Sequence, residues 1–505
     1  MYRWQIVLRL IWRHAPVSLF GWLFDRFFQK HNAFFSRPKE HITVSKKVSK
    51  TETTSDRRSF LQDSSKIVAA ASLAAGVSAP NLAVARGAYA GGTDTMKIGV
   101  IGCGGRGQGA VGNCLKTNSG NVELAAMGDV FGDRLDKALK NIEKRHAEKV
   151  KVKPENKHVG LDAFERVLAE DIDVVILATP PGFRPQHFEA AVAAGKHVFM
   201  EKPVAVDAPG IRRVLKASEL AKQKGLAVAV GLQRRHEPHY HQMIQKLQDG
   251  LIGDIVLARA YWNGDGVWTR PREKGQTELE YQMRNWYYFN WLCGDHIAEQ
   301  HIHNIDVINW LMDSYPVSAQ GQGGREVRTG PDTGEIFDHH LVEFTYANGT
   351  KFYSHCRHIP ECYRSVSEHC HGTNGSADIS RGLVWDKNGE EILRVKAKKG
   401  GHQQEQNDLF ADLRNGIIPN EGVYGAMSTM TAIFGRMATY SGKEIYWEDA
   451  IASNIQLANT DAMTDLKKDK APILPDADGN YPTATPGVGA KDVLDWQVKR
   501  KRRGK

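Results

Sequence analysis

The stretch "MKIGVIGCGGRGQGAVGNCL", Met96 to Leu115, contains the pattern that decides the fold of this chain. It begins with apolar residues typical of a buried strand, bends through a G-x-G-x-x-G turn and continues as a helix. In such a turn the first glycine permits a tight bend, the second lets the backbone approach a pyrophosphate, and the third allows close helix–strand packing. The helix N-terminus then offers free N–H groups to the phosphates. We therefore predict a dinucleotide-binding βα unit with Gly102, Gly104, Gly105, Arg106 and Gly107 at the cofactor.

A second apolar stretch, "VELAAMGD", ends in Asp129. An acidic residue at this strand end accepts hydrogen bonds from the adenosine ribose hydroxyls, which favours NAD. Arg134 lies close in sequence and would suit the 2′-phosphate of NADP. The sequence predicts NAD and leaves NADP open.

Strand and helix patterns continue in strict rotation. The strand in "DIDVVILATPP" ends at Thr179-Pro180, the strand in "KHVFMEKPVAV" ends at Glu201-Lys202, and a helical pattern follows each of them. This rotation predicts an α/β fold with a doubly wound parallel sheet, whose ligands lie at the carboxyl ends of the strands. Thr179, Pro180, Glu201 and Lys202 are accordingly predicted at the cofactor.

From about Gln233 the rotation stops and period-2 alternation begins, as in "GDIVLARAYWNG" and "HHLVEFTYANGTKFYSHCRH". These strands predict a second, α+β domain with an open, mostly antiparallel sheet. Between them lies a long aromatic and basic loop, "VWTRPREKGQTELEYQMRNWYYFNWLCG". Its aromatic rings suit sugar C–H groups, although half of them could equally be core or oligomer contacts.

The stretch "SDRRSFLQDSSKIVAAASLAAGVSAPNLAVARGAYA", residues 55–90, has the three parts of a twin-arginine export signal. Arg57-Arg58 comes first, an Ala-rich apolar run follows, and Ala88-Tyr89-Ala90 forms a small-x-small cleavage site. A membrane anchor is the alternative, but the apolar run is short for a bilayer span. The signal predicts the twin-arginine export machinery as a partner and a periplasmic or otherwise extracytoplasmic location.

The predicted organisation has five parts. Residues 1–54 are an N-terminal extension of unknown role, either an amphipathic membrane-surface segment or a translated upstream region. Residues 55–90 are the signal, 95–232 the Rossmann domain and 233–450 the substrate and oligomerisation domain. Residues 451–505 are a C-terminal tail.

Charge argues against nucleic acid as a partner. The net charge is +9, but residues 1–58 carry 12 Lys/Arg against 4 Asp/Glu, and the last seven residues carry six basic ones. The remaining body is mildly acidic, which is not the pattern of a nucleic-acid-binding domain. The six cysteines include no C-x-x-C pair, and the Cys/His-containing stretch "HCRHIPECYRSVSEHCH" fits no common zinc spacing.

The stretch "GDHIAEQHIHNIDVINWLM", Gly294 to Met312, combines three histidines with three carboxylates. Glu299, His303 and Asp306 are spaced i, i+4, i+7, which places them on one face if the stretch is a single helix. A histidine beside a carboxylate can exchange a proton near neutral pH. There is no H-E-x-x-H or H-x-x-E-H motif, so no metal ligand is predicted.

Together these motifs resemble the glucose–fructose oxidoreductase / inositol dehydrogenase / MocA (Gfo/Idh/MocA) family over residues 95–445. The resemblance rests on the glycine loop, "ATPP", "EKP" and the acidic helix. It implies that Lys202 touches the nicotinamide ribose and the substrate hydroxyl. The family's Asp, His, Asp pattern reads Glu299, His303 and Asp306 here, so the first carboxylate is one methylene longer. The resemblance also implies a tightly bound nucleotide, a helix returning to the first domain and oligomer contacts through the second sheet.

The leading hypothesis is an exported NAD(P)-dependent oxidoreductase that acts on a sugar or polyol hydroxyl. Lys202 would polarise the oxygen, His303 would accept the proton, and Glu299 would orient His303 or bind substrate. The further predicted substrate ligands are Arg234, Trp286, Tyr287 and Asp306. An NAD-dependent glycosidase acting by transient oxidation and elimination is the first alternative. A non-catalytic sugar-binding protein is the second.

Overall fold

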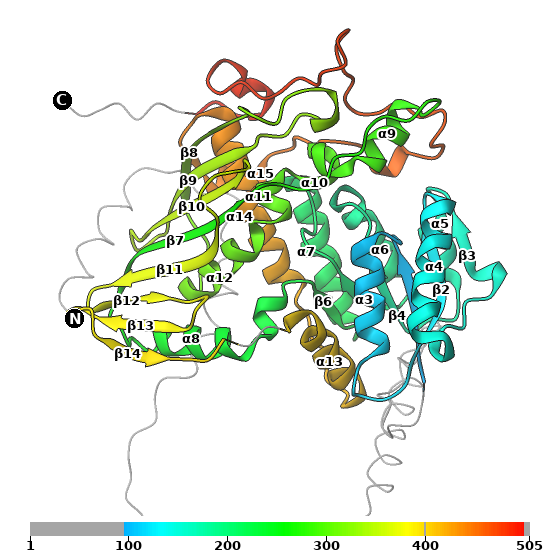
Figure 1. Cartoon of the computed structure of the whole chain (residues 1–505), viewed down its shortest axis with the longest axis horizontal. Helices are drawn as coiled ribbons and strands as arrows, with labels where there is room; N and C mark the ends of the chain where they lie inside the picture. The colour runs from blue at the N-terminus through cyan, green and yellow to red at the C-terminus, as the bar shows by residue number, and fades with distance from the viewer. Residues whose placement is uncertain (1–94, 398–399, 499–505) are drawn as a thin grey trace, which may run out of the picture. The chain divides into compact units, whose positions relative to one another are not determined.

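The computed structural model describes residues 95–397 and 400–498 (Figure 1). The predicted N-terminal extension, the export signal and the basic last seven residues lie outside these ranges. Within them, no helix is long and apolar enough to span a bilayer.

The first domain is a six-stranded, fully parallel sheet with strand order β3-β2-β1-β4-β5-β6. Helices α3 and α4 pack on one face together with α13 (Gly401–Arg414) from later in the chain. Helices α5, α6 and α7 pack on the opposite face. The doubly wound Rossmann sheet expected from the sequence is confirmed. Its elements are β1 Met96–Ile101, α3 Gly105–Leu115, β2 Val122–Asp129, α4 Gly132–His146, β3 Lys157–Val159, α5 Ala163–Ala169, β4 Val174–Leu177, α6 Arg184–Ala193, β5 His197–Met200, α7 Ala208–Gln223 and β6 Val228–Val230.

The second domain is a nine-stranded mixed sheet with order β14-β13-β12-β11-β7-β10-β9-β8-β15. Only the β7–β10 pairing is parallel, so the mostly antiparallel sheet is also confirmed. Side chains alternate between buried and partly exposed along β10, and α12 and α14 pack on the buried side of the sheet. The strands are β7 Ile255–Gly264, β8 Ser318–Gly324, β9 His339–Thr345, β10 Lys351–His358, β11 Ser365–Gly372, β12 Gly375–Asp378, β13 Leu383–Asp386, β14 Glu391–Arg394 and β15 Ile445–Tyr446.

Helices join the two domains into one body. Helix α13 packs against α3 of the Rossmann domain, as the resemblance implied, and α14 contacts both α7 and β8. Leu409 and Phe410 of α13 belong to the same buried cluster as Ile98 of β1. The remaining helices of this domain are α8 Pro238–Gln248, α9 Glu278–Arg284, α10 Asn290–Cys293, α11 His296–Glu299, α12 Ile302–Met312, α13 Gly401–Arg414, α14 Gly422–Ser441 and α15 Trp447–Ala452.

Two expectations about local structure are wrong. The stretch 294–312 is not one helix but two, because Gln300 and His301 lie between α11 and α12. Their side chains bond to the sheet instead: His301 Nε2 lies 2.8 Å from Ser354 Oγ, and Gln300 Oε1 lies 2.7 Å from His358 Nε2. These tertiary contacts override the helical period.

The predicted aromatic loop also contains α9 and α10, and most of its aromatic residues are buried in a core of their own. Part of the C-terminal tail packs on this core. Tyr481 is buried edge-on against Phe289, with ring centroids 4.9 Å apart, and its hydroxyl bonds to Glu278. Residues between Leu457 and Tyr481 thus pack on the aromatic core rather than trailing from it.

Candidate active site

The glycine loop at the carboxyl end of β1 is closely packed at Gly102 and Gly107 and leaves room for a ligand beside Gly104 and Gly105. Gly102 has φ +97°, and a Cβ on Gly107 would lie 2.0 Å from the Gly102 carbonyl oxygen, so both positions need glycine. A Cβ on Gly104 or Gly105 would meet no atom within 4 Å. The open side faces a cavity of about 280 Å³ whose lining includes Gly104, Thr179 and Pro180. This is the geometry that a pyrophosphate requires.

Asp129 is buried at the end of β2, where its two oxygens accept hydrogen bonds from Cys103 N (2.7 Å) and Phe131 N (2.9 Å). Burial raises the pKa of this carboxyl. Asp129 therefore fixes the glycine loop as well as lining the cavity, and Arg134 lines the same cavity. Both side chains that bear on the choice between NAD and NADP stand at one end of the cavity.

Glu201 connects the glycine loop to the carboxyl end of β5. It is 4% exposed and accepts a hydrogen bond from Arg106 Nε of the loop. The backbone carbonyls of Glu201 and Thr179 both accept from the guanidinium of Arg184, at 3.1 and 2.6 Å. The charges of Arg106 and Glu201 thus neutralise each other. Lys202 is the next residue in the chain after Glu201.

Lys202 and Glu299 come together from the two domains. Lys202 Nζ lies 3.1 Å from Glu299 Oε1, and it also donates to the Glu299 backbone carbonyl. Both side chains are mostly buried, at 12% and 15% exposure. A lysine held at both a carboxylate and a carbonyl keeps its ammonium in one place at the carboxyl edge of the sheet.

His303 lies beside this pair without bonding to Glu299 in the described structure. Its ring stacks on Trp262 with centroids 5.9 Å apart, and its Nδ1 is buried without a hydrogen-bond partner among the described residues. Burial, and then the positive charges of Lys202 and Arg234, lower its pKa well below the ordinary value. The imidazole is therefore neutral near pH 7, the form that accepts a proton. The predicted orientation of His303 by Glu299 stays a prediction.

Two predicted substrate ligands are held in ion pairs. Asp306 is 1% exposed and accepts two-pronged hydrogen bonds from Arg235, with Nε–Oδ2 and Nη2–Oδ1 distances of 2.9 Å. Arg234 Nη1 bonds to the buried Glu368. Asp306 of α12 thus pairs with Arg235, whereas Glu299 of α11 pairs with Lys202. Substrate contacts by Asp306 and Arg234 stay predictions.

The two predicted aromatic ligands occupy different places. Trp286 lines the nucleotide cavity together with Trp268, their centroids 6.1 Å apart. Tyr287 is buried near Glu299 and stacks on His358 with centroids 5.8 Å apart. Burial, and then the negative charge of Glu299, raise the pKa of Tyr287. The second domain thus supplies part of the wall of the Rossmann cavity.

Arg184, Arg235 and Glu368 were not expected at the site. Arg184 and Arg235 adjoin predicted residues in sequence, in "PGFR" and "QRRH". Glu368 gives no sequence signal, because its partner Arg234 lies 134 residues away.

Two family models match this chain. "Oxidoreductase family, NAD-binding Rossmann fold" matches residues 96–232, and "GFO/IDH/MocA C-terminal domain" matches residues 240–378. Together they span more than half of the 505 residues. The chain belongs to the Gfo/Idh/MocA family. Its glycine loop, Asp129 and Thr179 lie in the NAD-binding Rossmann domain of that family, and the open cavity beside the loop fits this cofactor.

Curated relatives in the Gfo/Idh/MocA family include inositol 2-dehydrogenases. That of Pseudomonas syringae is 26% identical over 256 residues, and that of Serratia proteamaculans is 29% identical over 260 residues. Each match covers 51% of this chain and 66% of the relative's own length.

Solved structures share the Gfo/Idh/MocA fold over 70% of this chain. Scyllo-inositol dehydrogenase from Lactobacillus casei, with bound NAD(H) and scyllo-inositol, is matched over 100% of its length at 21% identity and a TM-score of 0.53. Levoglucosan dehydrogenase in complex with NADH and levoglucosan is matched over 99% at 15% identity and a TM-score of 0.56. At these identities the likeness concerns the fold.

Proposed function

We propose that this protein oxidises a carbinol CH–OH group of a sugar or polyol with NAD, or reduces the matching carbonyl. The observation that carries this proposal is the meeting of Lys202 and Glu299, with His303 beside them, at the carboxyl edge of an NAD-binding domain. The inositol 2-dehydrogenase relatives support the same substrate class.

Bound NAD would supply the hydride acceptor for the carbinol carbon. The chain must then remove the hydroxyl proton and stabilise the charge that develops on the oxygen. Lys202 has three ammonium donors, and Glu299 occupies only part of them, so one can point to the substrate oxygen. His303, held neutral by its surroundings, is the proton acceptor. Reduction uses the same groups in reverse.

Trp262 and Arg234 give the proposed substrate its recognition surface. Trp262 stacks on His303 and presents a flat apolar ring, a face that suits sugar C–H groups. Arg234 uses one nitrogen for Glu368 and keeps further donors for hydroxyl groups.

The proposal extends to export, assembly and cofactor retention. Arg57-Arg58, the Ala-rich run and Ala88-Tyr89-Ala90 support export by the twin-arginine machinery to an extracytoplasmic compartment. Tight retention of the nucleotide suits such a compartment. The outward side of the nine-stranded sheet, where the exposed Leu341 lies in register with His355 and Tyr261, supports a homo-oligomer.

The direct test mixes purified protein with NAD and a panel of inositols, aldoses and anhydrosugars while reduced nicotinamide is followed by its near-ultraviolet absorbance. Net reduction with at least one polyol is expected. Lys202→Ala and His303→Ala should each cut turnover roughly 100-fold or more, as for loss of a polarising or acid–base group. Lys116→Ala, an exposed lysine on the same domain, should leave turnover unchanged.

Other outcomes separate the alternatives. Release of an aglycone from a glycoside without net NAD reduction would favour the glycosidase. Sugar binding without either reaction would favour the non-catalytic protein. Wild-type rates in both Lys202→Ala and His303→Ala would refute the site assignment.

A further inference from the structure

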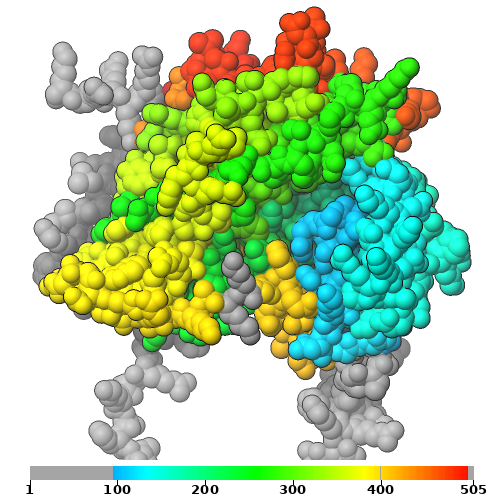
Figure 2. All heavy atoms as spheres, viewed as in Figure 1, coloured from blue at the N-terminus to red at the C-terminus, as the bar shows by residue number. Residues whose placement is uncertain are grey.

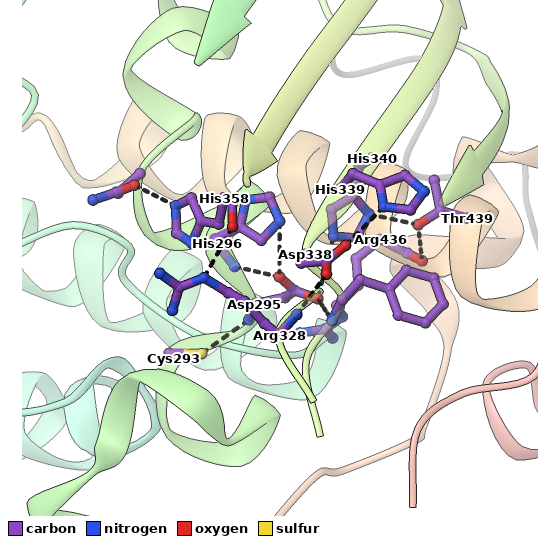
Figure 3. A network of polar contacts seen from close by, with 12 residues as sticks. Cys293, Asp295, His296, Arg328, Asp338, His339, His340, His358, Arg436 and Thr439 are labelled. Carbon is purple, nitrogen blue, oxygen red and sulfur yellow. Dashed lines mark hydrogen bonds and ion pairs between the residues drawn. The ribbon is translucent and has the colours of Figure 1, made fainter. Parts of the chain in front are cut away.

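A second polar cluster lies buried between α11 and the sheet. Asp295 and His296 stand at the start of α11, and His340 belongs to β9; their exposures are 0%, 0% and 3%. One donor atom from each of the three lies within 4.8 Å of the other two. Figure 3 shows these side chains with His358 in one network. None of them takes part in the proposed hydride and proton transfer.

His296 has no hydrogen-bond partner on either ring nitrogen among the described residues, although the side chain is fully buried. A neutral imidazole always carries one N–H donor and one lone pair. Leaving such groups unsatisfied in a protein interior destabilises the fold, because each has lost its hydrogen bonds to water. The ring nitrogens of His296 therefore require a further partner.

The hydrogen bonds around His340 fix which of its nitrogens carries the proton. Thr439 Oγ1 donates to the Arg436 carbonyl at 3.0 Å, so it can only accept from His340 Nδ1 at 2.9 Å. In the neutral ring the lone pair is then on Nε2. This atom lies 3.2 Å from Asp295 Oδ2, yet it is not aligned for a hydrogen bond.

The Asp295 carboxylate lies against this nitrogen in a fully buried place. Its Oδ2 accepts from the Tyr440 hydroxyl at 2.5 Å and from the Phe337 backbone N–H at 3.1 Å, and it faces His340 Nε2 with no hydrogen bond between them. In the neutral ring, a carboxylate oxygen and an imidazole lone pair therefore face each other in the interior. A positive ion between them would turn the repulsion into two bonds.

We propose that Asp295, His296 and His340 hold a divalent transition-metal ion, with Zn²⁺ as the leading candidate. Carboxylate and imidazole are ligands that Zn²⁺ accepts, at roughly 2.0–2.2 Å. An ion at about 2.1 Å from both Asp295 Oδ2 and His340 Nε2, which are 3.2 Å apart, would subtend an angle of roughly 100°, near the tetrahedral value. The carboxylate of Asp295 lies to one side of the lone-pair direction of His340 Nε2, which is the arrangement expected of two ligands that bind the same ion.

His358 packs against this cluster. Its Nε2 donates to Gln300 Oε1 at 2.7 Å, which leaves the lone pair of the neutral ring on Nδ1. That Nδ1 is also buried without a partner in the described structure, and the ring stacks on His296 with centroids 4.2 Å apart. His358 is not one of the three residues whose donor atoms lie within 4.8 Å of one another, so the fourth coordination position is left to a water molecule.

The role of this ion is to position, not to react. It would tie β9 to the first residues of α11, where Asp295 has φ 71°, a conformation that costs energy in a non-glycine residue. Glu299 is the last residue of the same short helix. Fixing the start of α11 thus fixes the carboxylate that meets Lys202. The metal site can therefore be tested whether or not the proposed substrate class is correct.

The test is the metal content of protein purified without chelator from zinc-supplemented medium, measured by plasma mass spectrometry. About one Zn per chain is expected in the wild type. It should fall at least tenfold in Asp295→Asn and in His340→Gln. His339→Gln is the matched control, because His339 is the neighbouring histidine of β9, half-exposed and bonded to Asp338, and it should keep the ion.

Wild-type protein with less than a tenth of an equivalent would overturn the proposal in favour of an ordered water or an imidazolium–carboxylate pair. Retention of zinc in folded Asp295→Asn and His340→Gln would overturn it too, since the ion would then lie elsewhere. Should these variants not fold, X-ray absorption of the wild type decides. A shell of imidazole and light atoms at about 2.0–2.1 Å supports the site, and a sulfur shell near 2.3 Å, which Cys293 would give, refutes it.

Discussion

At the residue scale, the contact between Lys202 and Glu299 depends on one displaced backbone hydrogen bond. In an unbroken α-helix the Glu299 carbonyl would accept from His303 N. His303 N instead donates to Gln300 O at 3.3 Å, and His301 N donates to His296 O at 3.2 Å. The Glu299 carbonyl is thereby released to accept from Lys202 Nζ. The same break that separates α11 from α12 gives Lys202 its second anchor.

Glu299→Asp tests whether the longer carboxylate matters for reach. Removing one methylene withdraws the carboxylate by roughly 1.5 Å, the length of one C–C bond, and breaks its 3.1 Å contact with Lys202. Because the backbone carbonyl still holds Lys202, we expect kcat to fall about tenfold, less than the roughly 100-fold or more that loss of a whole acid–base group costs, with KM little changed. Steady-state kinetics with the best polyol measure this. An unchanged kcat would mean that the carbonyl alone positions Lys202.

The protonation of His303 should determine how kcat/KM for oxidation falls at low pH. Burial, Lys202 and Arg234 lower its pKa below the ordinary 6.5, so it stays deprotonated and able to accept a proton as the pH falls from 8 to 6.5. We therefore expect kcat/KM for oxidation to lose its His303-dependent part only below pH 6.5. Initial rates from pH 5 to 8, with unfolding monitored in parallel, give the profile. An acid limb centred at pH 7 or above would argue against His303 as the acceptor.

At the scale of elements, the glycine loop separates packing from ligand binding within six residues. Gly107 is closed in by the Gly102 carbonyl, whereas the positions of Gly104 and Gly105 open onto the cavity. Helix α3 can approach β1 only without a side chain at 107, while the nucleotide needs the space beside 104.

A pair of alanine substitutions distinguishes these roles. Gly107→Ala should destabilise the fold by about 1–3 kcal/mol, because the new Cβ would lie 2.0 Å from a backbone oxygen. Gly104→Ala should leave unfolding unchanged and weaken NAD binding about tenfold or more, since its methyl group enters the space of the pyrophosphate. Urea unfolding and calorimetric titration with NAD measure the two effects. Equal stability in both variants would contradict the packing argument.

At the scale of the whole molecule, the Rossmann domain is completed by chain that comes much later in the sequence. Helix α13 packs on α3, and the segment after α15 covers the aromatic core that borders the nucleotide cavity (Figures 1 and 2). A cofactor bound between such parts is bound by a folded chain, which suits a route that exports folded proteins.

The proposed export signal can be tested by a charge-conserving change. Arg57-Arg58→Lys-Lys keeps both positive charges but removes the arginine pair that the twin-arginine pathway requires. We expect the extracytoplasmic fraction to fall at least tenfold, with the protein retained in the cytoplasm. Immunoblots of fractionated cells measure it, and the unaltered chain is the control. Equal export of the Lys-Lys variant would refute the twin-arginine assignment.

Three features could be predicted from residue pattern alone: the strand–turn–helix of residues 96–115, the alternation of parallel strands and helices up to residue 232, and the alternating strands of the second sheet. These depend on residue period and on glycine conformation, which are local properties of the chain. Lys202, Glu299 and His303 could also be predicted as site residues, because they belong to recognisable motifs, "EKP" and the acidic helix. The single helix over 294–312 was wrong because contacts of Gln300 and His301 with β10 decide where it breaks.

Only the tertiary structure decided which charges meet. Lys202 finds Glu299 97 residues away, Arg235 takes Asp306 from 71 residues away, and Arg234 takes Glu368 from 134 residues away. His296 of α11 was considered with its neighbours in sequence, yet His340, which lies close to it in space, comes from β9. A charged side chain in a packed interior pairs with whichever oppositely charged group the fold brings near it. The spacing of two residues along the chain does not indicate how close they lie in space.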